Sequence, residues 1–161
     1  MKKRAAPTRW HKLDNTANIF PVVASRRYSN VFRLTAVMRE AVDPALLQQA
    51  LEQTLPYFAA FNVRLRHGLF WNYLETNRAT PQVLPEQDAP CRYIDAVETG
   101  RFLFRVLYYG SRVHLETFHV LTDGTGAMQF LKAVCYRYCQ LAHPDAFTPE
   151  QLATPYGTET A

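Results

Sequence analysis

The chain has 161 residues, of which 48% are hydrophobic and 13% aromatic, so it can bury one sizeable core and gives no sign of a second. Its 3 cysteines argue against a disulfide framework, and no stretch is apolar enough for a membrane span or a signal peptide, which together favour a cytoplasmic protein. The net charge of +4 is concentrated near the N-terminus, where eight basic residues face one acidic residue within residues 1–33.

This basic segment would attract anions, either nucleic acid or the phosphates of a cofactor such as coenzyme A. The basic residues do not follow a helix, and no nucleic-acid-binding motif accompanies them, so a nucleic-acid partner is not expected. Residues 1–9 are interpreted as a flexible basic N-terminus.

A strand and a helix are the first predicted elements. Residues 30–38 alternate polar and apolar side chains, with Phe32 on the apolar face, which is typical of a half-buried strand. Asp43 and Pro44 then supply an N-cap and a first-turn proline for an amphipathic helix, and Pro56 would end or bend it.

A β-hairpin is predicted next. Residues 62–66 alternate, a His-Gly turn follows, and the aromatic run 69–74 would form the second strand. Residues 77–100 contain three prolines and little periodicity. We expect that segment to run over the surface and to contribute no site residue.

A second hairpin would pair residues 102–109 with 112–119 through a two-residue connection at Gly110 that suits a type II′ turn. Successive side chains alternate between the faces of a strand. This alternation places His119 on the face of Val113, Leu115 and Thr117, and Glu116 on the opposite face.

The last predicted helix covers residues 125–142, and a polar, proline-containing tail, residues 144–161, follows it. We therefore expect one folded unit at residues 10–143. The predicted buried stripe of this helix is Met128, Leu131, Val134, Cys135, Tyr138 and Leu141.

The junction between the second hairpin and this helix has the pattern His-x-x-x-Asp-Gly, formed by His119, Asp123 and Gly124. A neutral imidazole at a strand end can take a proton from an alcohol, an amine or a thiol near neutral pH. Asp123 stands where an N-cap belongs, so its role would be architectural. Gly124 would let the backbone turn and let a substrate approach the histidine.

The same pattern has a structural interpretation. A histidine at a strand end, satisfied by local hydrogen bonds and followed by a helix with an aspartate cap, needs no catalytic role. The loop by itself does not decide between the two interpretations.

The sequence resembles the N-terminal half of bacterial alcohol acetyltransferase-type proteins, in the superfamily of chloramphenicol acetyltransferase and condensation domains. The resemblance covers roughly residues 10–142, and it is carried by residues 10–21, 42–44, 64–71, 103–110 and 118–126. It implies an α/β fold, a two-layer sandwich of a mixed, largely antiparallel sheet with helices packed on one face.

The resemblance also implies the chemistry. His119 would act as general base while an acyl group moves from acyl-coenzyme A or an acyl-carrier thioester to an alcohol or amine. The thioester would be a co-substrate, with no permanently bound cofactor. The implied partners are that donor, the small acceptor, and either a missing C-terminal half or another subunit, so this chain alone is expected to be inactive.

The chain departs from the superfamily pattern at two positions. Phe118 stands where many relatives have a first histidine. Asn62 aligns with the arginine that usually pairs with the motif aspartate, which leaves Arg64 and Arg33 as candidate partners of Asp123. The alternative to an acyltransferase is a catalytically silent binding module that retains the fold.

Cys135, Cys139 and His143 also share one helical face. Three positions spread over about 12 Å of a straight helix cannot close a tetrahedral zinc site. No metal is assigned.

Overall fold

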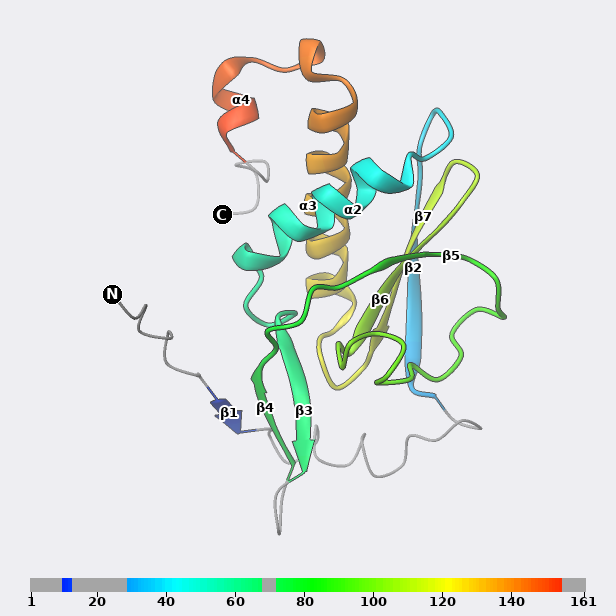
Figure 1. Ribbon diagram of the computed structural model, residues 1–161, viewed down its shortest axis with the longest axis vertical. Coiled ribbons are helices and arrows are strands. Elements are labelled where there is room, and N and C mark those ends of the chain that lie inside the picture. Colours follow the sequence, from blue (N-terminus) through cyan, green and yellow to red (C-terminus); the bar gives the residue numbers. More distant parts are fainter. Residues whose placement is uncertain (1–9, 13–28, 68–71, 155–161) are drawn as a thin grey trace.

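The computed structural model describes residues 10–12, 29–67 and 72–154 (Figure 1). The predicted flexible segment, residues 1–9, lies outside the described residues.

The described elements are seven strands, three α-helices and two short 3-10 helices, with β3 to β7 consecutive in the chain. Their bounds are β1 Trp10–Lys12, β2 Val31–Val37, α2 Pro44–Thr54, the 3-10 helix η1 Leu55–Tyr57, β3 Val63–His67, β4 Asn72–Thr76, β5 Val83–Pro85, β6 Phe104–Tyr109, β7 Arg112–Phe118, α3 Gly124–Ala142, η2 Pro144–Ala146 and α4 Pro149–Ala153.

The strands form two sheets. The larger has the order β2-β7-β6-β5, in which the β5–β6 pair is parallel and the others are antiparallel. The smaller has the order β1-β4-β3. Its β3–β4 pair corresponds to the first predicted hairpin, although β4 extends to Thr76, beyond the predicted strand at 69–74, of which 69–71 lie outside the described residues. Helices α2 and α3 cover one side of the larger sheet (Figure 1). The predicted α/β architecture is confirmed.

The β6–β7 hairpin turns where the sequence predicts. Tyr109 pairs with Arg112 across a two-residue connection, and Gly110 has φ +55. A positive φ at the first turn position suits the right-handed twist of the strands, and glycine adopts it without strain. The hairpin directs the C-terminal end of β7 toward the start of α3.

Helix α2 begins and ends at the predicted signals. Asp43 caps it, since its Oδ1 accepts hydrogen bonds from the backbone N–H of Ala45 at 2.8 Å and of Leu46 at 3.1 Å. The helix ends at Thr54, and the 3-10 helix η1, which contains Pro56, follows directly.

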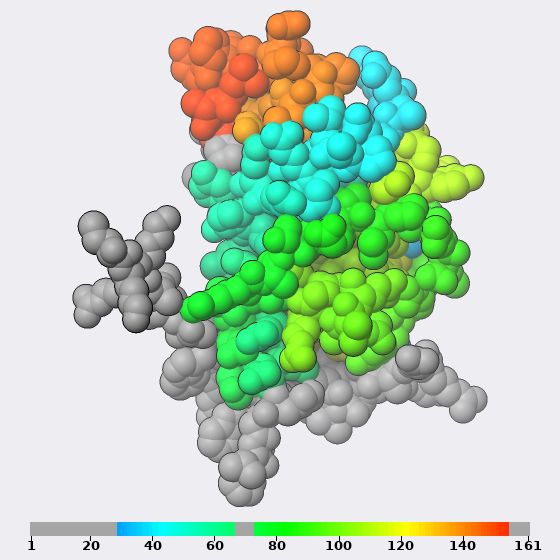
Figure 2. Space-filling model, viewed as in Figure 1, coloured from blue at the N-terminus to red at the C-terminus, as the bar shows by residue number. Residues whose placement is uncertain are grey.

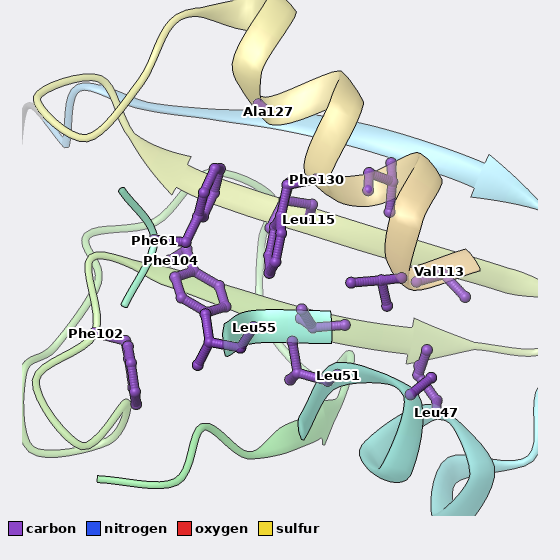
Figure 3. Packing of buried hydrophobic residues seen from close by; sticks show 14 of the residues in the cluster. Leu47, Leu51, Leu55, Phe61, Phe102, Phe104, Val113, Leu115, Ala127 and Phe130 are labelled. Carbon is purple, nitrogen blue, oxygen red and sulfur yellow. The ribbon is translucent and has the colours of Figure 1, made fainter. Parts of the chain in front are cut away.

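The core lies between the larger sheet and the two helices, and aromatic rings form much of it (Figure 3). Phe61 and Phe130 stack with 4.1 Å between their centroids, and Phe104 meets Phe130 edge to face at 5.3 Å. Because these rings come from the chain before β3, from α3 and from β6, their packing holds three distant segments together.

The buried face of α3 differs from the predicted stripe. Met128 is 41% exposed, and the fully buried positions include Ala127 and Phe130. Leu131, Val134 and Tyr138 are buried as expected. The stripe is rotated because α3 packs against α2 as well as against the sheet, so the face it buries starts at Ala127.

The prediction for residues 77–100 is wrong in part. This segment contains β5, which adds a parallel strand beside β6, and it buries Ile94 against Phe118 and Val120. In Figure 2 the green atoms of this part of the chain lie across the face below α2. A three-residue strand is too short to show a periodicity, and its partner is distant in sequence.

The segment expected as a polar tail begins with folded structure. Buried Gln140 of α3 donates to the carbonyl oxygens of Gln151 and Thr154, and Arg137 donates to that of Leu152 at 3.3 Å. These bonds attach α4 to α3. Within the described residues, none of the helices is long and apolar enough to cross a membrane.

Candidate functional site

The loop between β7 and α3 carries the His-x-x-x-Asp-Gly motif. Asp123 is the N-cap of α3, since its Oδ1 accepts a hydrogen bond from the N–H of Gly126 at 2.8 Å. A carboxylate at this position satisfies a free N–H group and interacts favourably with the helix dipole. Asp123 therefore ties the end of the loop to the first turn of α3.

His119 begins this loop and is exposed. Its backbone N–H donates to the carbonyl oxygen of Asn30 at 2.9 Å, and its ring centroid lies 4.5 Å from that of Phe32. Asn30 has φ +49, in the left-handed region, directly before β2. The start of β2 thus contacts both the backbone and the ring of His119, while the residue remains accessible to solvent.

The two glycines at the start of α3 differ in their surroundings. A methyl group added to Gly126 would collide with Oγ1 of Thr122, whereas one added to Gly124 would meet nothing within 4 Å. Alanine at position 126 would therefore force the Thr122 side chain to move. Gly124 borders open space.

Neither arginine expected near Asp123 binds it among the described residues. Arg64 pairs with Glu75, with 2.7 Å between Nε and Oε1. Arg33 pairs with Glu86 and Glu116. The reason is strand alternation: Arg33 lies on the face of β2 that is turned away from α3, and Arg64 belongs to the smaller sheet.

Behind β7 lies a buried ionic cluster that the sequence analysis missed. Glu116 is fully buried, with 0% exposure, and its two oxygens bind arginines from the two neighbouring strands. Arg33 Nε donates to Oε1 at 2.8 Å, and Arg105 Nε donates to Oε2 at 2.6 Å. The backbone N–H of Cys91 also donates to Oε1 at 2.7 Å. One carboxylate therefore links β2, β6, β7 and the segment after β5.

His114 extends this cluster. Its Nδ1 lies 2.9 Å from Thr35 Oγ1, and its Nε2 lies 3.3 Å from Oε2 of Glu86. Burial, and then the nearby Arg33, lower the pKa of His114, so its neutral form is favoured. The hydrogen bond from Arg33 holds the pKa of Glu86 below its ordinary value. The cluster thus joins arginine and glutamate side chains to an imidazole whose charged form is disfavoured by burial.

A signal for this cluster exists in the sequence. Arg33, Arg105 and Glu116 each stand near the middle of a predicted strand, and the predicted turn at Gly110 sets Arg105 opposite Glu116; the pairing of β2 with β7, which adds Arg33, is seen only in the structure. Strand alternation places them on the face away from the helices, where solvent is the usual expectation. Their burial depends on the segment between β5 and β6, which the sequence analysis assigned to the surface.

The cysteines of α3 lie far along the helix from the motif. Cys135, Cys139 and His143 line a groove of about 960 Å³ beside the C-terminal half of α3. Burial raises the pKa of the Cys135 thiol to about 12, so this thiol stays protonated, and a protonated thiol is a poor metal ligand. Within residues 29–67 and 72–154, no group of three or more His, Cys, Asp or Glu side chains is placed to hold a metal ion.

The sequence matches no protein-family model and no curated protein. Solved structures share its fold. A point mutant of the starter condensation domain of rhizomide synthetase matches with a TM-score of 0.66 at 14% identity, over 89% of this chain and 40% of that chain. The same domain in complex with C8-CoA matches with a TM-score of 0.64 at 13% identity, over 87% of this chain and 37% of that one.

Polyketide synthase associated protein 5 from Mycobacterium tuberculosis matches with a TM-score of 0.58 at 18% identity, over 82% of this chain and 33% of that chain. At such identities the similarity shows the fold alone. The chain therefore has the fold of part of a condensation domain, and it spans 40% or less of the length of these three structures.

Proposed function

We propose that this chain is part of an acyltransferase that moves an acyl group from acyl-coenzyme A or an acyl-carrier thioester to an alcohol or amine, with His119 as general base. The observation that carries the proposal is the setting of His119: exposed after β7, bound through its N–H to Asn30 and packed on Phe32. An imidazole oriented in this way, with solvent access, suits proton transfer to and from a small substrate.

The proposed reaction needs no covalent acyl-enzyme. A ring nitrogen of His119 takes the proton of the acceptor O–H or N–H while the acceptor oxygen or nitrogen attacks the thioester carbonyl. The C–S bond then breaks, and the departing thiolate receives the proton from His119. Asp123 holds the loop at the helix, and the space beside Gly124 admits the substrate.

Two further observations support this proposal. The fold is that of part of a condensation domain, and one matched condensation domain binds C8-CoA in its solved structure. The loop also resembles the corresponding motif of alcohol acetyltransferases. Because the chain spans 40% or less of these matched structures, we infer that a second half or another subunit completes the site. The few cysteines favour action in the cytoplasm.

The proposal is tested by measuring the release of free thiol from acetyl-coenzyme A. The assay uses simple alcohols and amines, and it is run on this chain alone and on longer or complemented versions. Acceptor-dependent release in at least one assembly is the expected result. No release from any assembly with any acceptor class would contradict the proposal.

A second candidate is a binding module without turnover. One observation favours it: Arg64 and Arg33 pair with glutamates and not with Asp123. The described loop is therefore held by the helix cap at Asp123, without the arginine pair that the resemblance implies for an acyltransferase. Calorimetric binding of acyl-coenzyme A without any acceptor-dependent thiol release would support this second candidate.

A further inference from the structure

The carboxylate of Glu116 lies on the opposite face of β7 from the motif, three residues before His119. We propose that Glu116 is a positioning residue for His119, acting through Arg33 and β2. The proposal rests on the general-base role proposed above for His119, although its structural part is measured separately below.

The first observation is that both carboxylate oxygens of Glu116 bind arginines. The register places Arg33, Glu116 and Arg105 directly opposite one another on β2, β7 and β6. Arg33 Nη2 lies 2.7 Å from Oε1 of Glu116, and Arg105 binds the other oxygen. A buried carboxylate between two guanidinium groups forms charge-assisted hydrogen bonds to both neighbouring strands.

The second observation is that the start of β2 and the residue before it supply two contacts of His119. Asn30, which accepts its backbone N–H, and Phe32, which packs on its ring, stand on either side of the start of β2 and close to Arg33. In the described sheet β2 is an edge strand, bonded along one side only, to β7. Its placement therefore depends on β7 and on side chains such as Arg33.

Substitution of Glu116 by glutamine would disturb this placement. The two arginines are donors only, while the glutamine amide offers one acceptor and one donor group. One guanidinium would then face an N–H donor instead of an oxygen. Arg33 keeps its second partner, Glu86, so the change weakens the side-chain contact that supplements the backbone ladder between β2 and β7, while Arg33 stays attached to the segment after β5.

The chain offers a matched control in the smaller sheet. Glu75 of β4 also binds two arginines, Arg64 at 2.7 Å and Arg66 at 3.1 Å, and its side chain is 16% exposed. Glu75→Gln removes the same charge from a similar pair of partners, but in a sheet that does not contain His119.

The experiment records the ring signals of His119 by NMR in chain labelled with isotopes in histidine. Phe32→Leu removes the aromatic ring beside His119, so it sets the signal change that corresponds to a lost contact. We expect Glu116→Gln to produce at least half of that change, and Glu75→Gln to leave the His119 signals at their wild-type positions. Circular dichroism reports whether each variant is folded.

A folded Glu116→Gln variant with wild-type His119 signals would overturn the proposal. If Glu116→Gln does not fold, Arg33→Lys replaces it, because lysine keeps the charge but cannot form the paired guanidinium contacts. Arg33→Lys should then shift the His119 signals, and unchanged signals would again overturn the proposal. The general-base role is tested separately, by the turnover of His119→Ala. Unchanged turnover in that variant would contradict the general-base role without affecting the NMR test of Glu116.

Discussion

The imidazole of His119 packs on the phenyl ring of Phe32, with 4.5 Å between the centroids and 44° between the ring planes. Phe32 pairs across the sheet with Thr117, two residues before the histidine. The start of β2 is therefore part of the candidate site, although the motif itself lies on the loop between β7 and α3. The two segments are separated in sequence by most of the described chain.

The cap at Asp123 should contribute to stability. Asp123→Ala removes the hydrogen bond to Gly126 and should lower the free energy of unfolding by about 1 kcal/mol. Asp43→Ala, which removes the cap of α2, should have a similar effect. Denaturant unfolding measures both. A melting temperature of Asp123→Ala equal to that of the wild type would show that the cap carries no stability.

The two glycines at the start of α3 should respond differently to alanine. Gly126→Ala should lower the melting temperature, because its methyl group collides with Thr122, whereas Gly124→Ala should leave it unchanged or raise it slightly, because alanine fits this helical position and restricts the unfolded chain. In an assembly that shows acyl transfer, Gly124→Ala should reduce the rate by narrowing the approach to His119. Thermal melts and thiol-release assays measure the two effects, and equal melts for both variants would argue against this distinction.

Local patterns in the sequence predict most of the elements around the site. Strand alternation, the Asp43–Pro44 cap and the Gly110 turn all correspond to described elements, because each depends on residues close in sequence. The rotated stripe of α3 could not be predicted in this way. Its orientation depends on contact with both α2 and the sheet, and Met128 is as apolar as the residues that are buried.

The burial of the ionic cluster is a second feature that local sequence patterns do not predict. Alternation correctly separates Glu116 from His119, but it gives no indication that Glu116 is buried. The burial comes from the segment that contains β5 and Cys91, whose parallel pairing with β6 is a long-range contact. On this face of the sheet Arg33 pairs with Glu86 and Glu116, and not with Asp123.

The ion pairs of the cluster should be far more important for stability than those of the smaller sheet. Arg105→Met leaves Glu116 buried with one arginine fewer, and should cost about 3 to 5 kcal/mol. Arg66→Met removes a contact whose arginine side chain is 44% exposed, and should cost about 1 kcal/mol or less. Urea unfolding of both variants measures the difference. Equal losses would contradict this account of the cluster.

Acid should destabilise the fold through His114 and Glu86. The pKa of His114 is lowered in the folded chain by burial and then by Arg33, so the unfolded chain binds the proton more readily. Stability should fall as the pH drops below the ordinary histidine value of about 6.5. The pKa of Glu86 is lowered by its hydrogen bond to Arg33, so its contribution is present above 4.5 and is lost as the pH falls through the folded value.

His114→Gln should reduce the loss of stability that occurs as the pH falls below about 6.5. Glutamine does not titrate, but it can still hydrogen-bond to Thr35. Chemical unfolding at a series of pH values between neutral and mildly acidic conditions measures the slope. If the slope of this variant equals that of the wild type, His114 is not the group responsible.

His119→Ala tests the central claim most directly, in whichever assembly shows acyl transfer. The matched control is His143→Ala, which changes a histidine at the opposite end of α3. Since His119 is exposed, its replacement should leave the melting temperature unchanged while the rate of thiol release falls by about 10²- to 10⁴-fold. Turnover close to that of the His143→Ala control, in a folded His119→Ala variant, would contradict the general-base role.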